Sequence, residues 1–329
     1  MKTYLVTGGC GFIGSHLIRH VLKNSNSSSI LNLDALTYAG NELNVRDIEK
    51  DYPTRYTFIK GDITDHKLVR SIFEENELDS VIHFAAESHV DRSFVDTQKF
   101  MKTNVLGTSV LLQVAKESWG EDGWNSKRFL HISTDEVYGS LPLDGDEKFT
   151  EDSPLKPRSP YAASKAAADL LAQSYFESFG FPVLITRCSN NFGPCQYPEK
   201  LIPLMILNMK NEKPLPIYGN GLHIRDWIYA EDHCKAICAV LENGQTGDVY
   251  NIIGEHQVDN ITLVNLLCEI VAFHTNKEKD YYTKYITFIK DSPVTICAIR
   301  WIVQKYRHKL DGNPLTILSK ISPPPFNGI

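Results

Sequence analysis

Paired cysteines are missing from this sequence. The seven cysteines are odd in number, scattered along the chain and never arranged as a Cys-x-x-Cys pair: Cys10, Cys188, Cys195, Cys234, Cys238, Cys268 and Cys297. This pattern argues against a disulfide framework and against a zinc site. We therefore predict reduced thiols in a cytoplasmic protein that holds no metal.

The sequence also lacks a long apolar run and an excess of positive charge. No apolar stretch approaches the roughly 18–20 residues that cross a bilayer. The chain enters a short strand at Tyr4 without a separate signal segment. The formal net charge is −6, which does not suggest a nucleic-acid partner. We expect a soluble protein that binds a small molecule.

What the sequence does contain is a regular alternation of strand and helix patterns. Helical patterns, including a long one at about 94–118, separate short apolar segments that are typical of strands. These segments are 4–6, 30–34, 56–59, 80–84, 129–133 and 183–186. The spacing predicts an α/β fold, a Rossmann-like, doubly wound parallel sheet.

The regular pattern loosens after Arg187, where prolines become frequent. We predict a Rossmann domain over residues 1–187, with a return segment at about 222–252. Residues 188–221 and 253–291 would form a smaller, mostly α-helical substrate lobe. Residues 292–329 form an atypical tail that we expect to be poorly ordered.

A glycine loop lies between the first strand and the first helix. Gly8, Gly11 and Gly14 allow a tight turn, a close backbone approach to a pyrophosphate and close packing of the helix. Asp34 ends the next strand, where a carboxylate binds ribose hydroxyls and repels a 2′-phosphate, so we predict NAD. A glycine turn without a ligand is the alternative. Asp62 would lie near the adenine or cap a helix.

Tyr161 and Lys165 are four residues apart in a predicted helix, and hence on one face. A neighbouring ammonium lowers the pKa of a phenol. Tyr161 is therefore a candidate base for a hydroxyl whose carbon loses a hydride. The same spacing occurs by chance in many helices, and the preceding dinucleotide loop gives it weight here.

Two adjacent carboxyl groups, Asp135 and Glu136, follow the fifth strand. The carboxyl ends of parallel strands face the cofactor crevice. A hydride transfer alone needs no such pair, whereas removal of water needs an acid and a base. Like charges in one cleft push two pKa values apart, which suits this division. A capped turn with solvated carboxylates is the alternative.

Several longer motifs resemble one family. From Met1 to about Lys290, the chain resembles the dTDP-glucose 4,6-dehydratases, in the nucleotide-sugar branch of the extended short-chain dehydrogenases/reductases. The segments that carry the resemblance are 7–14, Asp34 with 36–41, 85–93, 133–139, Tyr161 with Lys165, 187–194, 198–203 and 224–227.

The resemblance implies a hydro-lyase that converts dTDP-glucose to dTDP-4-keto-6-deoxyglucose with bound NAD. Tyr161 would take the proton of the glucose 4-hydroxyl while Thr134 holds the C4 oxygen. Glu136 would remove the C5 proton, and Asp135 would protonate the departing C6 hydroxyl. Lys165 would assist Tyr161 and hold the nicotinamide ribose.

The resemblance also implies binding residues and a partner. A homodimer would form through two long helices per subunit, at about 97–117 and 161–180. The cofactor-binding residues would be Gly8, Gly11, Phe12, Ile13, Gly14, Asp34, Leu36, Thr37, Asp62, Ile63, Ala85, Ala86, Tyr161 and Lys165. The substrate-binding residues would be Ser88, Asn190, Asn191, Glu199, Lys200, Arg225 and Asn260.

Three alternative functions stay open at this point. UDP-glucose would need the same sugar-reacting residues, because only the base pocket differs. An NAD-dependent epimerase or decarboxylase is a second alternative, although an epimerase needs no acid beside Glu136. An inactive NAD-binding protein is the third, because the tail is altered.

The resemblance stops after Asp291. The family continues with Arg-Pro-Gly-His-Asp-x-Arg-Tyr, whereas this chain continues with Ser-Pro-Val-Thr-Ile-Cys-Ala-Ile. Residues 292–329 hold five Lys or Arg and one Asp, a net charge of +4 in a chain of −6. If the codons from Pro293 onward are read two bases later, they permit the peptide Gly-His-Asp-Met-Arg-Tyr, which is part of the family's ending. A reading-frame shift near Ser292 explains this match, and an authentic divergent tail is the alternative.

Sequencing of the coding DNA tests the frame shift. We expect the codons from Pro293 onward to encode the family-like ending when they are regrouped by two bases. Codons that cannot yield that peptide would rule the shift out. The present tail lacks the phosphate-binding Arg and the base-side Tyr of the family, so we expect it to weaken substrate affinity.

Overall fold

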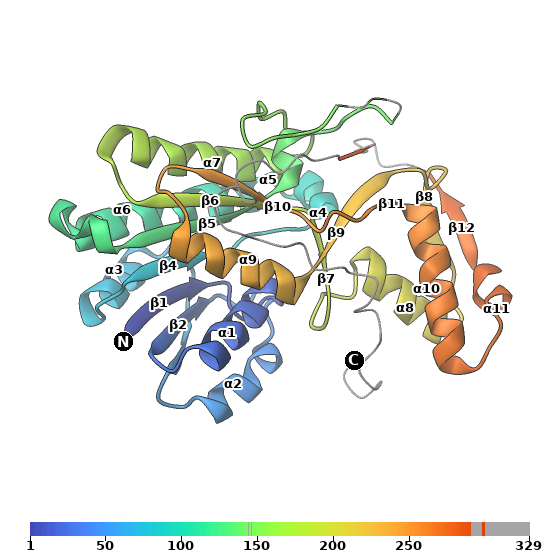
Figure 1. Cartoon of the computed structure of the whole chain (residues 1–329), viewed down its shortest axis with the longest axis horizontal. Helices are drawn as coiled ribbons and strands as arrows, with labels where there is room; N and C mark the ends of the chain where they lie inside the picture. Colours follow the sequence, from blue (N-terminus) through green and yellow to red (C-terminus); the bar gives the residue numbers. More distant parts are fainter. Residues whose placement is uncertain (144, 146, 291–297, 300–329) are drawn as a thin grey trace.

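A seven-stranded parallel sheet forms the centre of the computed structural model, which describes residues 1–143, 145, 147–290 and 298–299 (Figure 1). The strand order is β10-β6-β5-β4-β1-β2-β3. The seven strands are β1 (Lys2–Thr7), β2 (Ser28–Asp34), β3 (Tyr56–Lys60), β4 (Ser80–His83), β5 (Arg128–Thr134), β6 (Val183–Cys188) and β10 (Val249–Ile252). The predicted Rossmann-like sheet is confirmed.

The central strands are apolar on both faces because helices cover both faces of the sheet. Leu5 in β1 pairs with Leu31 in β2 and with Val81 in β4, and all three are buried. All four residues of β4 and all six of β6 are buried as well. Near-continuous burial of this kind is typical of strands in a parallel sheet.

Two groups of helices cover the sheet, one on each face. α1 and α9 pack together and contribute Leu17, Ile18 and Ile237 to one core. α3, α6 and α7 contribute to the core on the other face. These helices, with the shorter ones on the same domain, are α1 (Phe12–Asn24), η1 (Glu42–Asn44), α2 (Arg46–Asp51), α3 (His66–Glu75), α4 (Val90–Val95), α5 (Thr97–Phe100), η2 (Met101–Gly107), α6 (Thr108–Trp119), η3 (Glu121–Ser126), η4 (Asp135–Tyr138), α7 (Pro160–Phe179) and α9 (Ala230–Asn243).

The helix predicted at about 94–118 is interrupted at Asp96, since Phe94 and Val95 belong to the preceding helix α4. Asp96 has non-helical dihedral angles and caps α5 by accepting a hydrogen bond from the Lys99 N–H, so the helical run starts at Thr97. The run then passes through a π-helical turn, η2, before α6. No periodicity in the sequence indicates that turn.

The small lobe combines helices with two short sheets (Figure 1). One sheet has the order β11-β9-β7 and the other pairs β12 with β8. Met209, Trp227, Leu267 and Tyr282 are buried in its core. The elements of the lobe are β7 (Asn190–Phe192), α8 (Leu201–Lys210), β8 (Leu215–Tyr218), β9 (Ile224–Tyr229), β11 (Gln257–Asp259), α10 (Asn260–Thr275), α11 (Asp280–Thr283) and β12 (Ile286–Ile289).

The chain crosses between the two parts more than once. β10 returns to pair with β6, and α9 returns to pack on α1, whereas β9 pairs inside the lobe. The domain limits given above stay a prediction. The predicted disorder of the tail lies outside the described residues, except that Ala298 bridges to Leu141 and to Ile224. Among the described helices, none combines the length and the apolar character needed to cross a bilayer.

A buried polar network joins the sheet to α7. Arg187 Nε donates to Asp169 Oδ2 at 2.8 Å, and Arg187 also donates to the Tyr138 hydroxyl at 2.8 Å. His131 Nε2 lies 3.3 Å from Asp169 Oδ1. Burial lowers the pKa of His131 to about 4, so His131 is neutral and Arg187 is the cation that balances Asp169.

Asp169→Ala tests this network. The substitution leaves the Arg187 cation buried without its carboxylate, and we expect the free energy of unfolding to fall by about 3–5 kcal/mol. Urea unfolding followed by circular dichroism measures the change. Arg70→Gln is the control, since it breaks the exposed ion pair with Glu117 and should leave the midpoint almost unchanged. Equal midpoints for Asp169→Ala and the original chain would contradict the assignment.

Candidate active site

A cavity of about 460 Å³ lies at the carboxyl ends of the central strands. Its wall includes Gly8 after β1, Asp34 at the end of β2, Ala85 after β4, Thr134 at the end of β5 and Cys188 at the end of β6. Parallel strands bring these chain positions to one edge of the sheet. The cavity also reaches α7 through Tyr161 and Lys165.

The glycine loop is packed too closely for side chains. Gly8 has a φ of +74°, and a Cβ atom there would lie 2.7 Å from the Ala85 nitrogen. A Cβ atom on Gly14 would lie 2.5 Å from the Gly8 carbonyl oxygen. No side chain caps the first turn of α1, which lines the cavity through Phe12 and Ile13. A backbone cradle at a helix N-terminus suits a diphosphate.

Asp34 is held in place by backbone donors. Its Oδ2 accepts a hydrogen bond from the Cys10 N–H at 2.9 Å, and its Oδ1 accepts one from the Leu36 N–H at 2.7 Å. Burial raises the pKa of this carboxyl, and the two N–H groups oppose that rise. Each oxygen keeps further acceptor capacity toward the cavity. This is the arrangement that a ribose diol requires.

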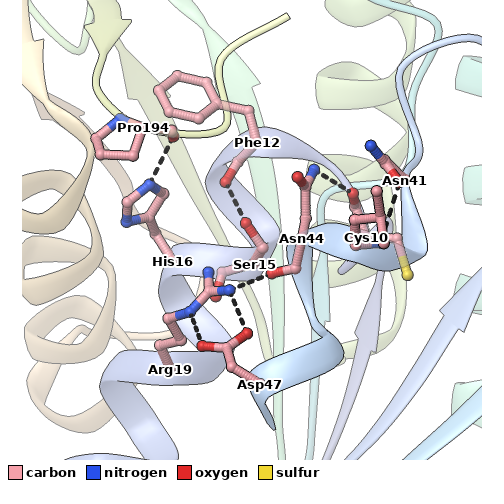
Figure 2. A network of polar contacts seen from close by, with 10 residues as sticks. Cys10, Phe12, Ser15, His16, Arg19, Asn41, Asn44, Asp47 and Pro194 are labelled. Carbon is pink, nitrogen blue, oxygen red and sulfur yellow. Dashed lines mark hydrogen bonds and ion pairs between the residues drawn. The ribbon is translucent and has the colours of Figure 1, made fainter. Parts of the chain in front are cut away.

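A second network holds the loop from behind (Figure 2). The Cys10 carbonyl accepts hydrogen bonds from the Asn41 N–H at 3.1 Å and from the Asn44 side chain at 2.9 Å. Arg19 on α1 donates to the Asn44 carbonyl and to both oxygens of Asp47. The segment after β2 therefore positions the glycine loop through side chains that the glycine motif does not include.

The adjacent carboxyl groups Asp135 and Glu136 have different surroundings. Asp135 is 3% exposed, and its Oδ1 accepts a hydrogen bond from the Thr134 hydroxyl at 3.1 Å. Burial and the neighbouring Glu136 raise the pKa of Asp135 to about 8. Glu136 lines the cavity, and burial raises its pKa while Arg225 and Lys200 favour its carboxylate. Asp135 is thus protonated at neutral pH.

Tyr161 and Lys165 both line the cavity, as the helical spacing predicts. The expected lowering of the Tyr161 pKa is wrong for this structure. Burial and the nearby Glu136 raise the pKa of Tyr161, and Lys165 Nζ donates instead to the Ile132 carbonyl at 2.8 Å. Burial also lowers the pKa of Lys165 to about 8, which weakens its effect as a fixed cation.

Asn104 is a buried residue that supports the cavity wall and that the sequence does not reveal. Its side chain is buried and spans from the backbone N–H and carbonyl of Glu87 to the Ser164 hydroxyl. Glu87 lines the cavity, and Ser164 precedes Lys165 on α7. Asn104 lies in the π-helical turn, and such turns are frequent at functional sites. No local pattern marks it.

A second cavity of about 280 Å³ lies beside the first, toward the small lobe. Asn190, Leu201 and Trp227 line both cavities. Arg225 and Glu199 are charged side chains in its wall. The two cavities therefore form adjacent compartments with a common wall.

Most of the site residues predicted from the sequence come together here. Leu36 and Asp135 are not among the described residues that line either cavity, since Leu36 packs against the core and Asp135 lies behind Thr134. The second cavity is lined by Asn190, Glu199, Arg225 and Asn260. The first is lined by Gly8, Gly11, Phe12, Ile13, Gly14, Asp34, Thr37, Asp62, Ile63, Ala85, Ala86, Ser88, Thr134, Glu136, Tyr161, Lys165, Asn190, Asn191 and Lys200.

Asp62 has a turn role as well as a place in the cavity wall. Its Oδ1 accepts hydrogen bonds from the N–H and the hydroxyl of Thr64. The helix cap that was its alternative role belongs to Asp65, which caps α3.

Comparison with known proteins gives a consistent set of relatives. A family model described as GDP-mannose 4,6 dehydratase matches residues 5–309. The dTDP-glucose 4,6-dehydratase of Salmonella typhimurium is 46% identical over 299 residues, covering 88% of this chain and 82% of that protein. The Haemophilus influenzae enzyme of the same name is 47% identical, with 89% and 87% covered.

Solved structures agree with these relatives. The dTDP-glucose 4,6-dehydratase of Streptomyces venezuelae with NAD bound has a TM-score of 0.87 at 39% identity, covering 97% of this chain and 94% of that one. The Bacillus anthracis dTDP-glucose 4,6-dehydratase in complex with NAD has a TM-score of 0.83 at 40% identity, covering 96% and 93%.

The raised pKa of Asp135 predicts a pH-dependent stability difference. The folded protein keeps the Asp135 proton up to about pH 8, whereas an unfolded Asp loses it near pH 4. Rising pH between these values therefore favours unfolding. Asp135→Asn cannot titrate, so its melting temperature relative to the original chain should rise from pH 4 to pH 8 and then level off. A difference that is constant with pH would contradict the shift.

Proposed function

The chain belongs to the GDP-mannose 4,6-dehydratase family, and from its 46% identity to dTDP-glucose 4,6-dehydratase we propose that it catalyses that reaction. It converts dTDP-glucose to dTDP-4-keto-6-deoxyglucose and water. The sugar is oxidised at C4, water is eliminated across C5 and C6, and the hydride returns to C6. No net oxidation occurs.

The observation that carries this proposal is the pair Asp135 and Glu136 beside Tyr161. An enzyme that only transfers a hydride needs the Tyr161–Lys165 pair alone. Here an acid with a pKa of about 8 adjoins a carboxylate that faces cations. An elimination of water needs both groups, one in each protonation state.

The hydrogen-bonding groups that line the first cavity match those that NAD requires. The backbone of Gly8 to Gly14 would hold the diphosphate, and Asp34 would accept hydrogen bonds from the adenosine ribose. NAD would supply a hydride acceptor and donor there, and the positive charge of its oxidised ring would favour the Tyr161 phenolate. The Asp34 carboxylate would repel a 2′-phosphate.

Tyr161 is the proposed base for the 4-hydroxyl, and Thr134 orients the C4 oxygen. Both side chains line the cavity, and the Thr134 hydroxyl lowers the pKa of Tyr161 against the effect of burial. Lys165, which also lines the cavity, would bind the nicotinamide ribose. Once C4 is a ketone, the hydrogen on C5 becomes acidic, and the charge that develops on the C4 oxygen needs these donors.

In the elimination, Glu136 acts as the base and Asp135 as the acid. Glu136 takes the C5 proton, since Arg225 and Lys200 favour its carboxylate form. Asp135 gives its proton to the departing C6 hydroxyl, since burial and Glu136 keep it protonated near neutral pH. Asp135 itself does not line the cavity, and its carboxyl is linked to the cavity through the Thr134 hydroxyl, which donates to Asp135 Oδ1 at 3.1 Å.

The nucleotide diphosphate is assigned to the second cavity and the adjoining part of the first. Arg225 and Asn260 line that cavity, and Asn191 and Lys200 line the first cavity. Charge-assisted hydrogen bonds from Arg and Lys suit phosphate oxygens. Burial lowers the pKa of Lys200, and a phosphate beside it would favour the ammonium.

We also propose a cytoplasmic homodimer. Met101 and Leu106 in η2 and Leu170 and Phe179 in α7 are 42–57% exposed. η2 and α7 pack against each other, so these apolar side chains belong to neighbouring helices. Burial against a second copy would remove them from water. The scattered, unpaired cysteines support the cytoplasmic location.

Turnover of dTDP-glucose by the full chain with added NAD tests the function. The product should weigh one water less than the substrate, whereas epimerisation leaves the mass unchanged. Tyr161→Phe and Glu136→Gln should each lower kcat by about 100-fold or more with a smaller effect on KM. Tyr175→Phe is the matched control, because it removes a hydroxyl from the same helix, where that hydroxyl donates to Gln113.

A parallel assay separates the site from the tail. The same chain is prepared with the family-like ending after Asp291. Activity in that protein alone would locate the defect in residues 292–329. Absence of product from both proteins would reject the dehydratase assignment for this substrate.

A further inference from the structure

Three chain segments meet at the boundary between the two cavities. They carry Tyr38 from the loop after β2, Arg92 on α4, and the loop with Tyr197 and Glu199 that precedes α8. Tyr38 and Tyr197 line the first cavity, and Glu199 lines the second. The first two segments belong to the Rossmann part of the chain and the third to the small lobe.

Arg92 contacts one residue of each cavity. Its guanidinium carbon lies 4.1 Å from the centre of the Tyr38 ring, within the range of a cation–π contact. Its Nη2 donates to Glu199 Oε2 at 3.0 Å. The planar guanidinium can make both contacts at once, with its face on the ring and its edge toward the carboxylate.

Tyr38 is held from two further sides. Its hydroxyl lies 3.2 Å from the Ser88 hydroxyl, and its ring meets the Tyr197 ring edge-on at 5.4 Å. Ser88 and Tyr197 line the first cavity as well. The position of Tyr38 at the cofactor cavity therefore depends on the segment 197–200, both directly and through Arg92.

Only one carboxylate oxygen of Glu199, Oε2, accepts a hydrogen bond among the described residues. Its Oε1 is excluded from solvent and has no hydrogen-bond partner among the described residues. His89 Nε2 lies 3.4 Å away without the geometry of a hydrogen bond. Burial and Lys200 lower the pKa of His89, so it is neutral at pH 7 and does not balance the carboxylate. Among the described residues, Arg92 is the permanently charged group that forms an ion pair with Glu199.

We propose that Arg92 couples the two cavities, so that a nucleotide in the second cavity slows release of the dinucleotide from the first. A nucleotide that contacts Glu199 fixes the position of this carboxylate. Glu199 then holds Arg92, and Arg92 holds the Tyr38 ring at the first cavity. The second ligand then binds to a segment that is already ordered. Arg92 is a positioning residue here. The coupling rests on the proposed function and is reciprocal.

The dissociation rate of NADH from the full chain tests the coupling. Bound NADH is chased with excess NAD and followed by its fluorescence, with and without dTDP. In the original chain dTDP should slow release. In Arg92→Gln release without dTDP should be about fivefold faster, because the cation–π contact and the ion pair are both lost. The effect of dTDP should be largely abolished.

Three further variants make the result specific. Glu199→Gln should also reduce the effect of dTDP, and the Arg92→Gln/Glu199→Gln pair should add little to either single change. Arg92→Lys keeps the charge but not the flat stacking face, so it should restore the effect only in part. Arg70→Gln breaks an exposed ion pair of the same kind with Glu117 and should behave like the original chain.

The outcomes separate this inference from the proposed function. If NADH and dTDP both bind but dTDP slows release equally in the original chain and in Arg92→Gln, the coupling through Arg92 is wrong and the dehydratase assignment is untouched. If the original chain binds neither ligand, the proposed function fails and the coupling fails with it. Melting temperatures near that of the original chain establish that the variants are folded.

Discussion

The parallel pairing of β1, β4, β5 and β6 is the constraint on which the site depends. Because all four strands run in one direction, Gly8, Ala85, Thr134 and Cys188 leave the sheet at the same edge. An antiparallel neighbour would have placed its following loop at the opposite edge. The glycine loop, the carboxyl pair and the end of β6 are close in space for this reason, although about 180 residues separate Gly8 from Cys188 in sequence.

Burial of charge is the second constraint, and it decides what each group at this edge can do. Asp135 and Glu136 differ little in sequence context, yet only Glu136 faces both Arg225 and Lys200. The same burial lowers the pKa of Lys165 and raises that of Tyr161. Desolvation disfavours every charged form, and the position of each opposite charge then distinguishes an acid from a base. The chemistry therefore depends on the lobe as much as on the sheet.

Polar side chains join the two parts of the chain at the boundary between the two cavities. Arg92, Tyr38 and Glu199 meet there; Arg92 is exposed, and the other two are partly exposed. A single guanidinium therefore contacts one residue of each cavity, the Tyr38 ring and the Glu199 carboxylate.

The sequence by itself determined the sheet, the glycine loop with Asp34, and the Tyr161–Lys165 and Asp135–Glu136 pairs, because each is a local pattern in which the spacing along the chain sets the geometry. It also identified most of the cavity wall through the family resemblance. Only the tertiary structure decided which groups lie close across long separations: Asn104 beneath Glu87, Asp135 behind Thr134, and Arg92 between Tyr38 and Glu199. Those contacts, and the pKa values that follow from them, depend on packing between distant segments, which no local periodicity encodes.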